Sequence, residues 1–205
     1  TSVPQGLLFF RSMIQWFGGM GLIVLAVAVL PALGIGGLEL IASESPGPTA
    51  DRLSLKVRDT ARRLWLLYGL LTGLISVALL FAGMSIFDAV THAFTTVATG
   101  GYSTYGDSIA HFDSFLVEAV LIAGMLYCGA SFSTHWHAAT AGLGAYRRVS
   151  EIRWYLWMIF SAFVLLVLVN AGELDWLENL RDSAFYAVSL GTSTGFGTSD
   201  YIAWM

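Results

Sequence analysis

Charge is scarce in this sequence. Lysine, arginine, aspartate and glutamate make up 12% of its 205 residues, about half the share that is usual in soluble domains. Cysteine is nearly absent too, and because Cys128 has no second cysteine to pair with, a disulfide framework is excluded. Residues 1–6 carry no charge, and the apolar run after them is too long for a secretory signal. Since position 1 is not methionine, we expect the chain to begin inside a longer protein.

Long apolar segments fill most of the sequence, and 56% of all residues are hydrophobic. The first segment has no charged residue between Arg11 and Glu39, which is enough for a helix to cross roughly 30 Å of hydrocarbon. This composition indicates an integral membrane protein. We therefore predict an all-α membrane fold with four apolar segments, at about residues 6–38, 64–87, 115–146 and 154–172.

The basic residues are concentrated in two loops. Eight of the ten lysines and arginines lie in residues 39–63 and 147–153, which leaves only Arg11 and Arg181 elsewhere. Short loops rich in lysine and arginine stay on the cytoplasmic side of a membrane. We therefore predict that both loops are cytoplasmic and that the other connections face outward.

One six-residue pattern occurs twice. Residues 99–104 read TGGYST, and ninety-four residues later 193–198 read STGFGT. Both copies have the order hydroxyl, variable, glycine, aromatic, small, threonine, and the match extends upstream to the pair Asp88 and Asp182. Each copy follows an apolar run too short to cross a bilayer. We therefore predict, for each copy, a half-buried pore helix followed by a strip of extended backbone near the outer face.

Strips of this kind are suited to binding a dehydrated cation. A potassium filter replaces the water shell of the ion with backbone carbonyls, helped by threonine or serine hydroxyls, and glycine tolerates the positive φ that aligns such carbonyls. Asp88 and Asp182 begin the two short helices and are predicted to cap their N-termini. The predicted K+ ligands are Thr99, Gly100, Gly101, Tyr102, Ser193, Thr194, Gly195 and Phe196.

These features divide the chain into successive pore units. Since a potassium pore needs about four strips around its axis, two strips amount to half of a pore. The predicted parts are a closing transmembrane helix of an earlier unit (1–40), a basic linker (41–63), a complete unit (64–146, strip 99–104), a second linker (147–153) and a later unit up to its strip (154–205, strip 193–198).

Several motifs resemble the Trk/Ktr/HKT superfamily of potassium transporters, and most closely the bacterial Trk-type membrane subunit. They are RSMIQWFGGMG (11–21), PGP (46–48), TARRLW (60–65) and FTTVATGGYST (94–104). The resemblance covers essentially the whole chain. It implies four pore units in one polypeptide, of which this chain carries the end of the first, the second, and the third up to its filter. It also implies that Gly101 and Gly195 are filter glycines that favour potassium over sodium.

The resemblance carries further expectations. It implies potassium uptake across the inner or plasma membrane by a protein that is not an enzyme and holds no covalently bound cofactor. It also implies a homodimer surrounded by membrane lipid, and a cytosolic nucleotide-binding regulatory subunit that the loops at 39–63 and 147–153 would face. We expect no nucleic-acid partner. A gate after the third filter is implied as well, beyond the end of this chain.

Two other classes of protein stay open. One is the pore subunit of an ATP-driven potassium pump, which has the same repeated design. The other is a membrane enzyme or carrier that binds haem or a metal through His135 and His137, although these residues are two apart and would point to different helix faces. His92, inside the first short helix, is interpreted as a structural histidine rather than part of an ion relay.

Overall fold

The computed structural model describes residues 3–32, 49–142, 144, 146, 149–172 and 175–198. Every secondary-structure element in these ranges is a helix, which confirms the predicted all-α class. The PGP motif, Arg147-Arg148 and the chain after Thr198 lie outside the described residues. The elements are α1 (Gln5–Ala32), α3 (Thr49–Phe81), α4 (Ile86–Val97), the 3-10 helix η1 (Ser108–Phe112), α5 (Phe115–Cys128), α6 (Phe132–Ala141), α8 (Ser150–Val169) and α9 (Trp176–Gly191).

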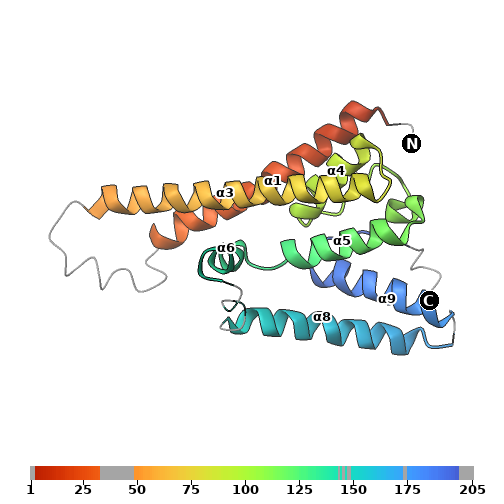
Figure 1. The fold of residues 1–205 in the computed structure, drawn as a ribbon. Helices are drawn as coiled ribbons and strands as arrows, with labels where there is room; N and C mark the ends of the chain where they lie inside the picture. The colour runs from red at the N-terminus through yellow and green to blue at the C-terminus, as the bar shows by residue number, and fades with distance from the viewer. Residues whose placement is uncertain are drawn as a thin grey trace.

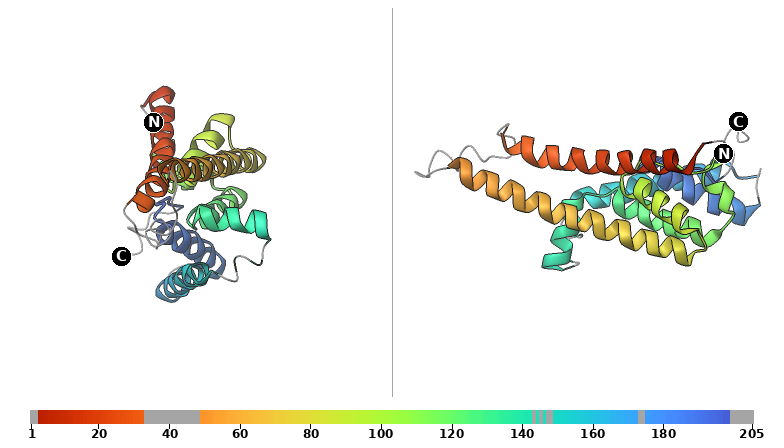
Figure 2. Two further views of the ribbon diagram at one scale, coloured as in Figure 1. Left: turned by 90° about the vertical axis from the view of Figure 1, so that its left-hand side faces the viewer. Right: turned by 90° about the horizontal axis from the view of Figure 1, so that it is seen from above.

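The helices form a layered bundle. The long α1 and α3 lie side by side, and the short α4 packs against both. On the other side of this group α5 contacts α3, α4 and α9, and α9 packs against α8 (Figures 1 and 2). The starts of α1 and α5 lie at the same end of the bundle as the ends of α3 and α8, so successive long helices run in alternating directions (Figure 1).

Two of the described helices are long and apolar enough to cross a membrane, namely Thr60–Phe81 within α3 and Ser150–Val169, which is α8. Only 6% of the apolar window of α8 is buried inside this chain. Its exposed side chains include Trp157 and Leu165. α8 therefore lies at the periphery of this chain, with most of its apolar side chains exposed. In a membrane, lipid or further protein must cover such a surface.

The apolar segment predicted at 115–146 is divided in the structure. α5 ends at Cys128, the chain passes through Gly129 as a C-cap, and α6 starts at Phe132 after a bend of 90°. His135 holds the bend, because its Nε2 lies 2.7 Å from the Tyr127 carbonyl oxygen and its Nδ1 lies 2.8 Å from the Tyr146 hydroxyl. Hydropathy does not reveal the bend, since both halves are apolar.

The two short helices contribute much of the core. On α4, the side chains of Ala89, Ala93 and Val97 are buried along one face, and His92 and Thr95 are buried as well. A helix that is buried on several faces is surrounded by other elements. α9 contributes buried side chains in the same way, including Phe185, Ala187, Val188 and Ser189.

Candidate ion-binding site at two repeated loops

The loops after α4 and α9 share one backbone conformation. Thr99 and Gly101 have φ of 50° and 64°, and the residues ninety-four positions later, Ser193 and Gly195, have φ of 55° and 85°. Positive φ is uncommon for a residue with a side chain. Its recurrence at Thr99 and Ser193 therefore indicates that both loops are held in a shape that isolated chain would not prefer.

Hydrogen bonds from two successive amides turn each loop in the same direction. Gly100 N and Gly101 N both donate to the Thr95 carbonyl oxygen, at 2.7 and 3.4 Å. Thr194 N and Gly195 N donate to the Ser189 carbonyl oxygen at 2.9 and 3.2 Å. In a trans peptide the carbonyl oxygen points away from the N–H of the next residue. The carbonyl oxygens of the preceding residues, which are Thr99 and Gly100 in one loop and Ser193 and Thr194 in the other, are therefore directed away from the helix before the loop.

A hydroxyl at the same position in each pore helix supports the aromatic residue of the loop. Thr95 Oγ1 donates to the Tyr102 carbonyl oxygen at 2.9 Å, and Ser189 Oγ donates to the Phe196 carbonyl oxygen at 2.7 Å. Among the described residues, no hydrogen bond reaches the carbonyl oxygens of the three positions before each aromatic residue. These six positions are Thr99, Gly100, Gly101, Ser193, Thr194 and Gly195.

The two loops are in contact. A Cβ atom added at Gly101 would overlap the Thr194 carbonyl oxygen, so only glycine allows this approach of one backbone to the other. Further out, Ile109 N in η1 donates to the Gly197 carbonyl oxygen at 2.9 Å, and Gly197 N donates to Ser108 Oγ at 3.2 Å. The repeated loops therefore lie side by side, although ninety-four residues separate them.

The aromatic residues of the two loops have different surroundings. Phe196 is 1% exposed, and its ring centroid lies 5.9 Å from that of His92. Tyr102 is 47% exposed, and the Arg11 guanidinium lies over its ring at 4.4 Å. Arg11 also donates to the Ser103 carbonyl oxygen at 2.8 Å. One loop is thus supported by the core, whereas the other is supported from outside by α1.

The predicted helix caps need correction. Ser85, not Asp88, is the N-cap of α4, and its side chain accepts from Asp88 N. α9 starts at Trp176 after Asp175, so Asp182 lies inside the helix beyond its first turn. The prediction failed at Asp88 because Ser85, three residues earlier, takes the cap position. It failed at Asp182 because α9 extends further toward its N-terminus than the matching part of α4.

The two aspartates instead hold the last residue of the repeated pattern. Thr104 Oγ1 donates to Asp88 Oδ1 at 2.7 Å, and Thr198 Oγ1 lies 3.4 Å from Asp182 Oδ1. Asp88 also accepts from Tyr105 Oη at 3.2 Å. The threonine that ends each copy of the pattern is therefore tied back to its own pore helix.

Sequence reasoning missed two links between these elements. Arg181 on α9 donates two hydrogen bonds to the Glu118 carboxylate on α5, at 2.6 and 2.7 Å. His92 Nε2 lies 2.9 Å from Ser103 Oγ, which connects α4 to its loop. Arg181 was already unusual as one of only two basic residues outside the basic loops, but its partner is 63 positions away.

The histidines proposed for haem or metal binding are not together. His135 is buried at the bend, while His137 is exposed on another face of α6. In the described part of the chain, no group of three or more histidine, cysteine, aspartate or glutamate side chains is placed to hold a metal ion. His92 has a partner on each ring nitrogen, since its Nδ1 lies 2.8 Å from the Asp88 carbonyl oxygen.

The sequence of this chain matches a known protein family. The sequence model of the TrkH family, described as cation transport protein, matches residues 1–205. This chain belongs to the TrkH family. The Trk system potassium uptake protein TrkH of Escherichia coli K12 is 40% identical over 99% of this chain and 43% of its own length. TrkG of the same organism is 38% identical over 100% of this chain and 43% of its own length.

A solved structure agrees with the family assignment. The crystal structure of the potassium transporter TrkH from Vibrio parahaemolyticus superposes with a TM-score of 0.85 at 33% identity, over 100% of this chain and 42% of that one. The chain thus spans less than half the length of the relatives it matches. Family membership and the apolar helices establish a membrane protein of a transporter family.

Proposed function

We propose that this chain is the central part of a subunit that takes up potassium ions through a pore. The observation that carries the proposal is the pair of adjacent loops with one backbone conformation, whose carbonyl oxygens at six positions have no hydrogen-bond partner among the described residues. Relatives named as Trk system potassium uptake proteins support uptake over the pump and haem alternatives.

In this proposal, a dehydrated potassium ion passes along the carbonyl oxygens of Thr99–Gly101 and Ser193–Gly195. The oxygens replace its water shell, and the C-terminal ends of α4 and α9 direct their partial negative charge toward it. Tyr102 and Phe196, also predicted as ligands, contribute less, because each carbonyl oxygen already accepts a hydrogen bond from a hydroxyl. Further strips from the remainder of the polypeptide complete the ring.

The proposed orientation puts the basic segments 39–63 and 147–153 in the cytoplasm and the two repeated loops near the outer face of the cell membrane. It depends on the charge distribution, and the alternating directions of α1, α3, α5 and α8 are compatible with it. The linker predicted at 41–63 is not a loop from Thr49 onward, because residues 49–63 form the start of α3. The proposed boundaries of the pore units remain those at 1–40, 41–63, 64–146, 147–153 and 154–205. A homodimer and a cytosolic nucleotide-binding regulatory subunit belong to the same proposal.

Ion uptake by the full-length protein tests this function. In cells that lack their own potassium uptake systems, we expect Gly101→Ser and Gly195→Ser to lose discrimination between potassium and sodium. At Gly101 the reason is steric as well as conformational, because a side chain would meet the Thr194 carbonyl oxygen. Positive φ at a residue other than glycine adds about 1–3 kcal/mol of strain.

Gly106→Ser is the matched control. Gly106 lies in the same loop region and is exposed, and no described residue other than its two chain neighbours has an atom within 4 Å of an added Cβ. Wild-type discrimination in this control, together with loss in the other two variants, supports the proposal. Wild-type discrimination in all three variants would remove both glycines from the filter.

A further inference from the structure

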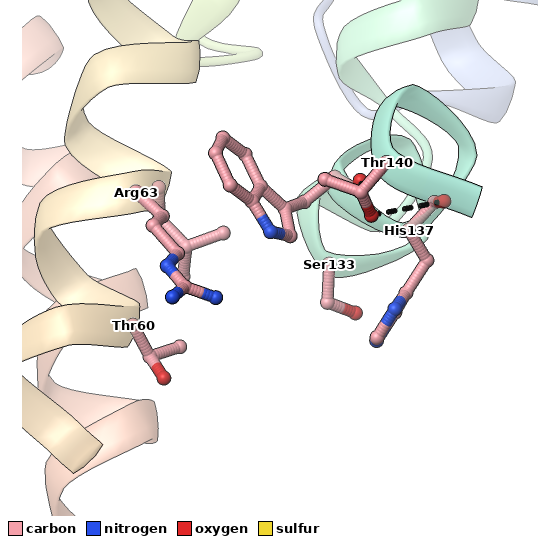
Figure 3. A pocket seen from close by; sticks show the side chains of 7 residues that line it. Thr60, Arg63, Ser133, His137 and Thr140 are labelled. Carbon is pink, nitrogen blue, oxygen red and sulfur yellow. Dashed lines mark hydrogen bonds between the residues drawn. The ribbon is translucent and has the colours of Figure 1, made fainter. Parts of the chain in front are cut away.

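A cavity of about 340 Å³ lies between the start of the membrane-crossing part of α3 and the bent helix α6. Thr60 and Arg63 project into it from α3, while Ser133 and His137 come from α6 on the opposite side (Figure 3). The cavity is separate from the repeated loops. Its polar or aromatic lining residues are Thr60, Arg63, Ser133, Trp136, His137 and Thr140.

The bend after α5 creates this cavity. Ser133, Trp136, His137 and Thr140 follow the spacing i, i+3, i+4 and i+7, so they share one face of α6. His135, on another face, is buried and fixed to the end of α5. Anchoring through His135 therefore turns the opposite, polar and aromatic face of α6 toward α3.

Arg63 gives the cavity its chemistry. Its guanidinium lies 5.6 Å from the centre of the Trp136 ring, and an arginine stacked on an aromatic face keeps its in-plane N–H donors available for a planar or tetrahedral anion. None of the ion pairs found among the described residues uses Arg63. The exposed Ser133 hydroxyl and His137 ring on the facing helix supply further groups that can bind oxygen atoms. Ser133 Oγ lies 2.9 Å from Ser131 Oγ, and when Ser131 is the donor of this bond the Ser133 O–H can point to a ligand. A phosphate group fits this combination of donors.

The depth of the cavity indicates where such a phosphate would come from. Thr60 begins the apolar stretch Thr60–Phe81, so Arg63 lies within the first turn of a membrane-crossing helix. α6 is bent by 90° from α5 and lies across the long helices (Figure 2), so it would run along the surface of a membrane that those helices cross. Tryptophan near helix ends is typical of the headgroup region, and basic pockets between transmembrane helices on the cytoplasmic side bind anionic lipid headgroups.

We propose that this cavity binds the phosphate of an anionic phospholipid headgroup, held by Arg63 on α3 and by Ser133 and His137 on α6. The lipid would then join α3 to α6 and stabilise the bend after Cys128. The location of the cavity at the cytoplasmic surface depends on the orientation proposed above. The binding chemistry does not, because it involves residues outside the ion pathway.

Binding of phosphatidylglycerol to the purified, delipidated full-length protein tests the proposal, with native mass spectrometry to count bound lipids. We expect the wild type to bind phosphatidylglycerol more tightly than phosphatidylcholine. Arg63→Gln should weaken binding of phosphatidylglycerol about fivefold, the effect of one basic residue near an anionic headgroup. Arg62→Gln is the matched control, because Arg62 is an exposed arginine on the same helix that does not line the cavity.

A second variant approaches the site from the other helix. Ser133 is exposed in the first turn of α6, where a carboxylate is compatible with the helix dipole, so Ser133→Asp should fold and repel the lipid phosphate. Wild-type affinity in Ser133→Asp, or equal losses in the Arg62 and Arg63 variants, would overturn the site. If an equal concentration of inorganic phosphate displaced the lipid, the cavity would be a site for free phosphate and the lipid proposal would be wrong.

Potassium uptake by the same variants separates this proposal from the proposed function. A protein that transports no potassium but loses phosphatidylglycerol selectively in Arg63→Gln would contradict only the proposed function. A protein that transports potassium normally but shows no difference between Arg62→Gln and Arg63→Gln would contradict only the lipid site.

Discussion

Arg181 and Glu118 form a two-pronged ion pair between α9 and α5, with N–O distances of 2.6 and 2.7 Å. The pair joins α9 to α5, which belong to two successive pore units in the proposed division of the chain. The Glu118 side chain is 5% exposed, whereas that of Arg181 is 35% exposed and also lies 3.8 Å from Asp113. Removal of the arginine and removal of the glutamate should therefore lower the stability of the protein by different amounts.

We expect Arg181→Met to destabilise the protein more than Glu118→Gln. Removing the arginine leaves a buried carboxylate without its partner, at a cost of about 3 kcal/mol. Removing the carboxylate leaves an arginine that still reaches solvent and Asp113, at a cost of about 1 kcal/mol. The midpoint of thermal unfolding of the full-length protein measures the difference.

Asp113→Asn is the control for this ion pair, because the Asp113 side chain is 93% exposed. It should change the midpoint little, since exposed pairs contribute about 0–1 kcal/mol. Equal destabilisation by Arg181→Met and Glu118→Gln would contradict the asymmetry.

The hydroxyls behind the aromatic residues should matter for selectivity. We expect Thr95→Val and Ser189→Ala each to lower discrimination between potassium and sodium, because the Tyr102 or Phe196 carbonyl oxygen loses the hydrogen bond that holds it. At Phe196, which is buried, loss of such a bond costs about 1–3 kcal/mol. Competitive uptake of the two ions by cells that carry each variant measures the effect.

Thr91→Val provides the comparison on the same helix. Thr91 is buried one turn before Thr95, but within the described part of the chain its hydroxyl bonds only to carbonyl oxygens of α4, at 2.8 Å from Phe87 O and 3.1 Å from Asp88 O. Its replacement should leave discrimination unchanged. A loss as large as that of Thr95→Val would assign the effect to α4 as a whole.

Replacement of Asp88 and of Asp182 should lower the stability of the protein by unequal amounts. Asp88 accepts hydrogen bonds from Ser85, Thr104 and Tyr105 side chains, whereas the contact of Asp182 with Thr198 is long, at 3.4 Å. We therefore expect Asp88→Asn to lower stability by about 2 kcal/mol, the range for bonds to a charged group, and Asp182→Asn to cost less than about 1 kcal/mol. Thermal unfolding of both variants measures this, and a larger loss at Asp182 would refute it.

The close packing at Gly129 predicts a steric effect. A Cβ there would lie 2.7 Å from Tyr155 Oη and 2.8 Å from Thr192 Cγ2. Gly129→Ala should therefore destabilise the protein by about 1–3 kcal/mol through overpacking, and lower uptake because Thr192 directly precedes the second loop. Gly73→Ala is the control and should be neutral or stabilising, because beyond the adjacent backbone of its own helix no described residue has an atom within 4 Å of the added Cβ. Equal midpoints of unfolding for the two variants would exclude overpacking.

Much of the fold and part of the candidate site were predictable from local patterns. Apolar length predicted the helices, and the repeat between 99–104 and 193–198 identified two loops that share positive φ at matching positions. These predictions succeeded because the hydropathy of a segment and the conformational freedom of its glycines depend only on residues that are close together in the sequence. The assignment of the eight residues as potassium ligands stays a prediction.

Other features depended on contacts that no local pattern contains. The sequence by itself determined the membrane class, the repeat and the glycines at two of the four positive-φ positions of the repeated loops, Gly101 and Gly195, since these follow from composition and from the sterics of single residues. Only the tertiary structure decided that Asp88 and Asp182 hold threonines rather than cap helices, that Arg181 meets Glu118, and that Gly101 lies against Thr194. The physical reason is that each of these depends on how separate segments pack and where a helix begins, which the spacing of residues along the chain leaves undetermined.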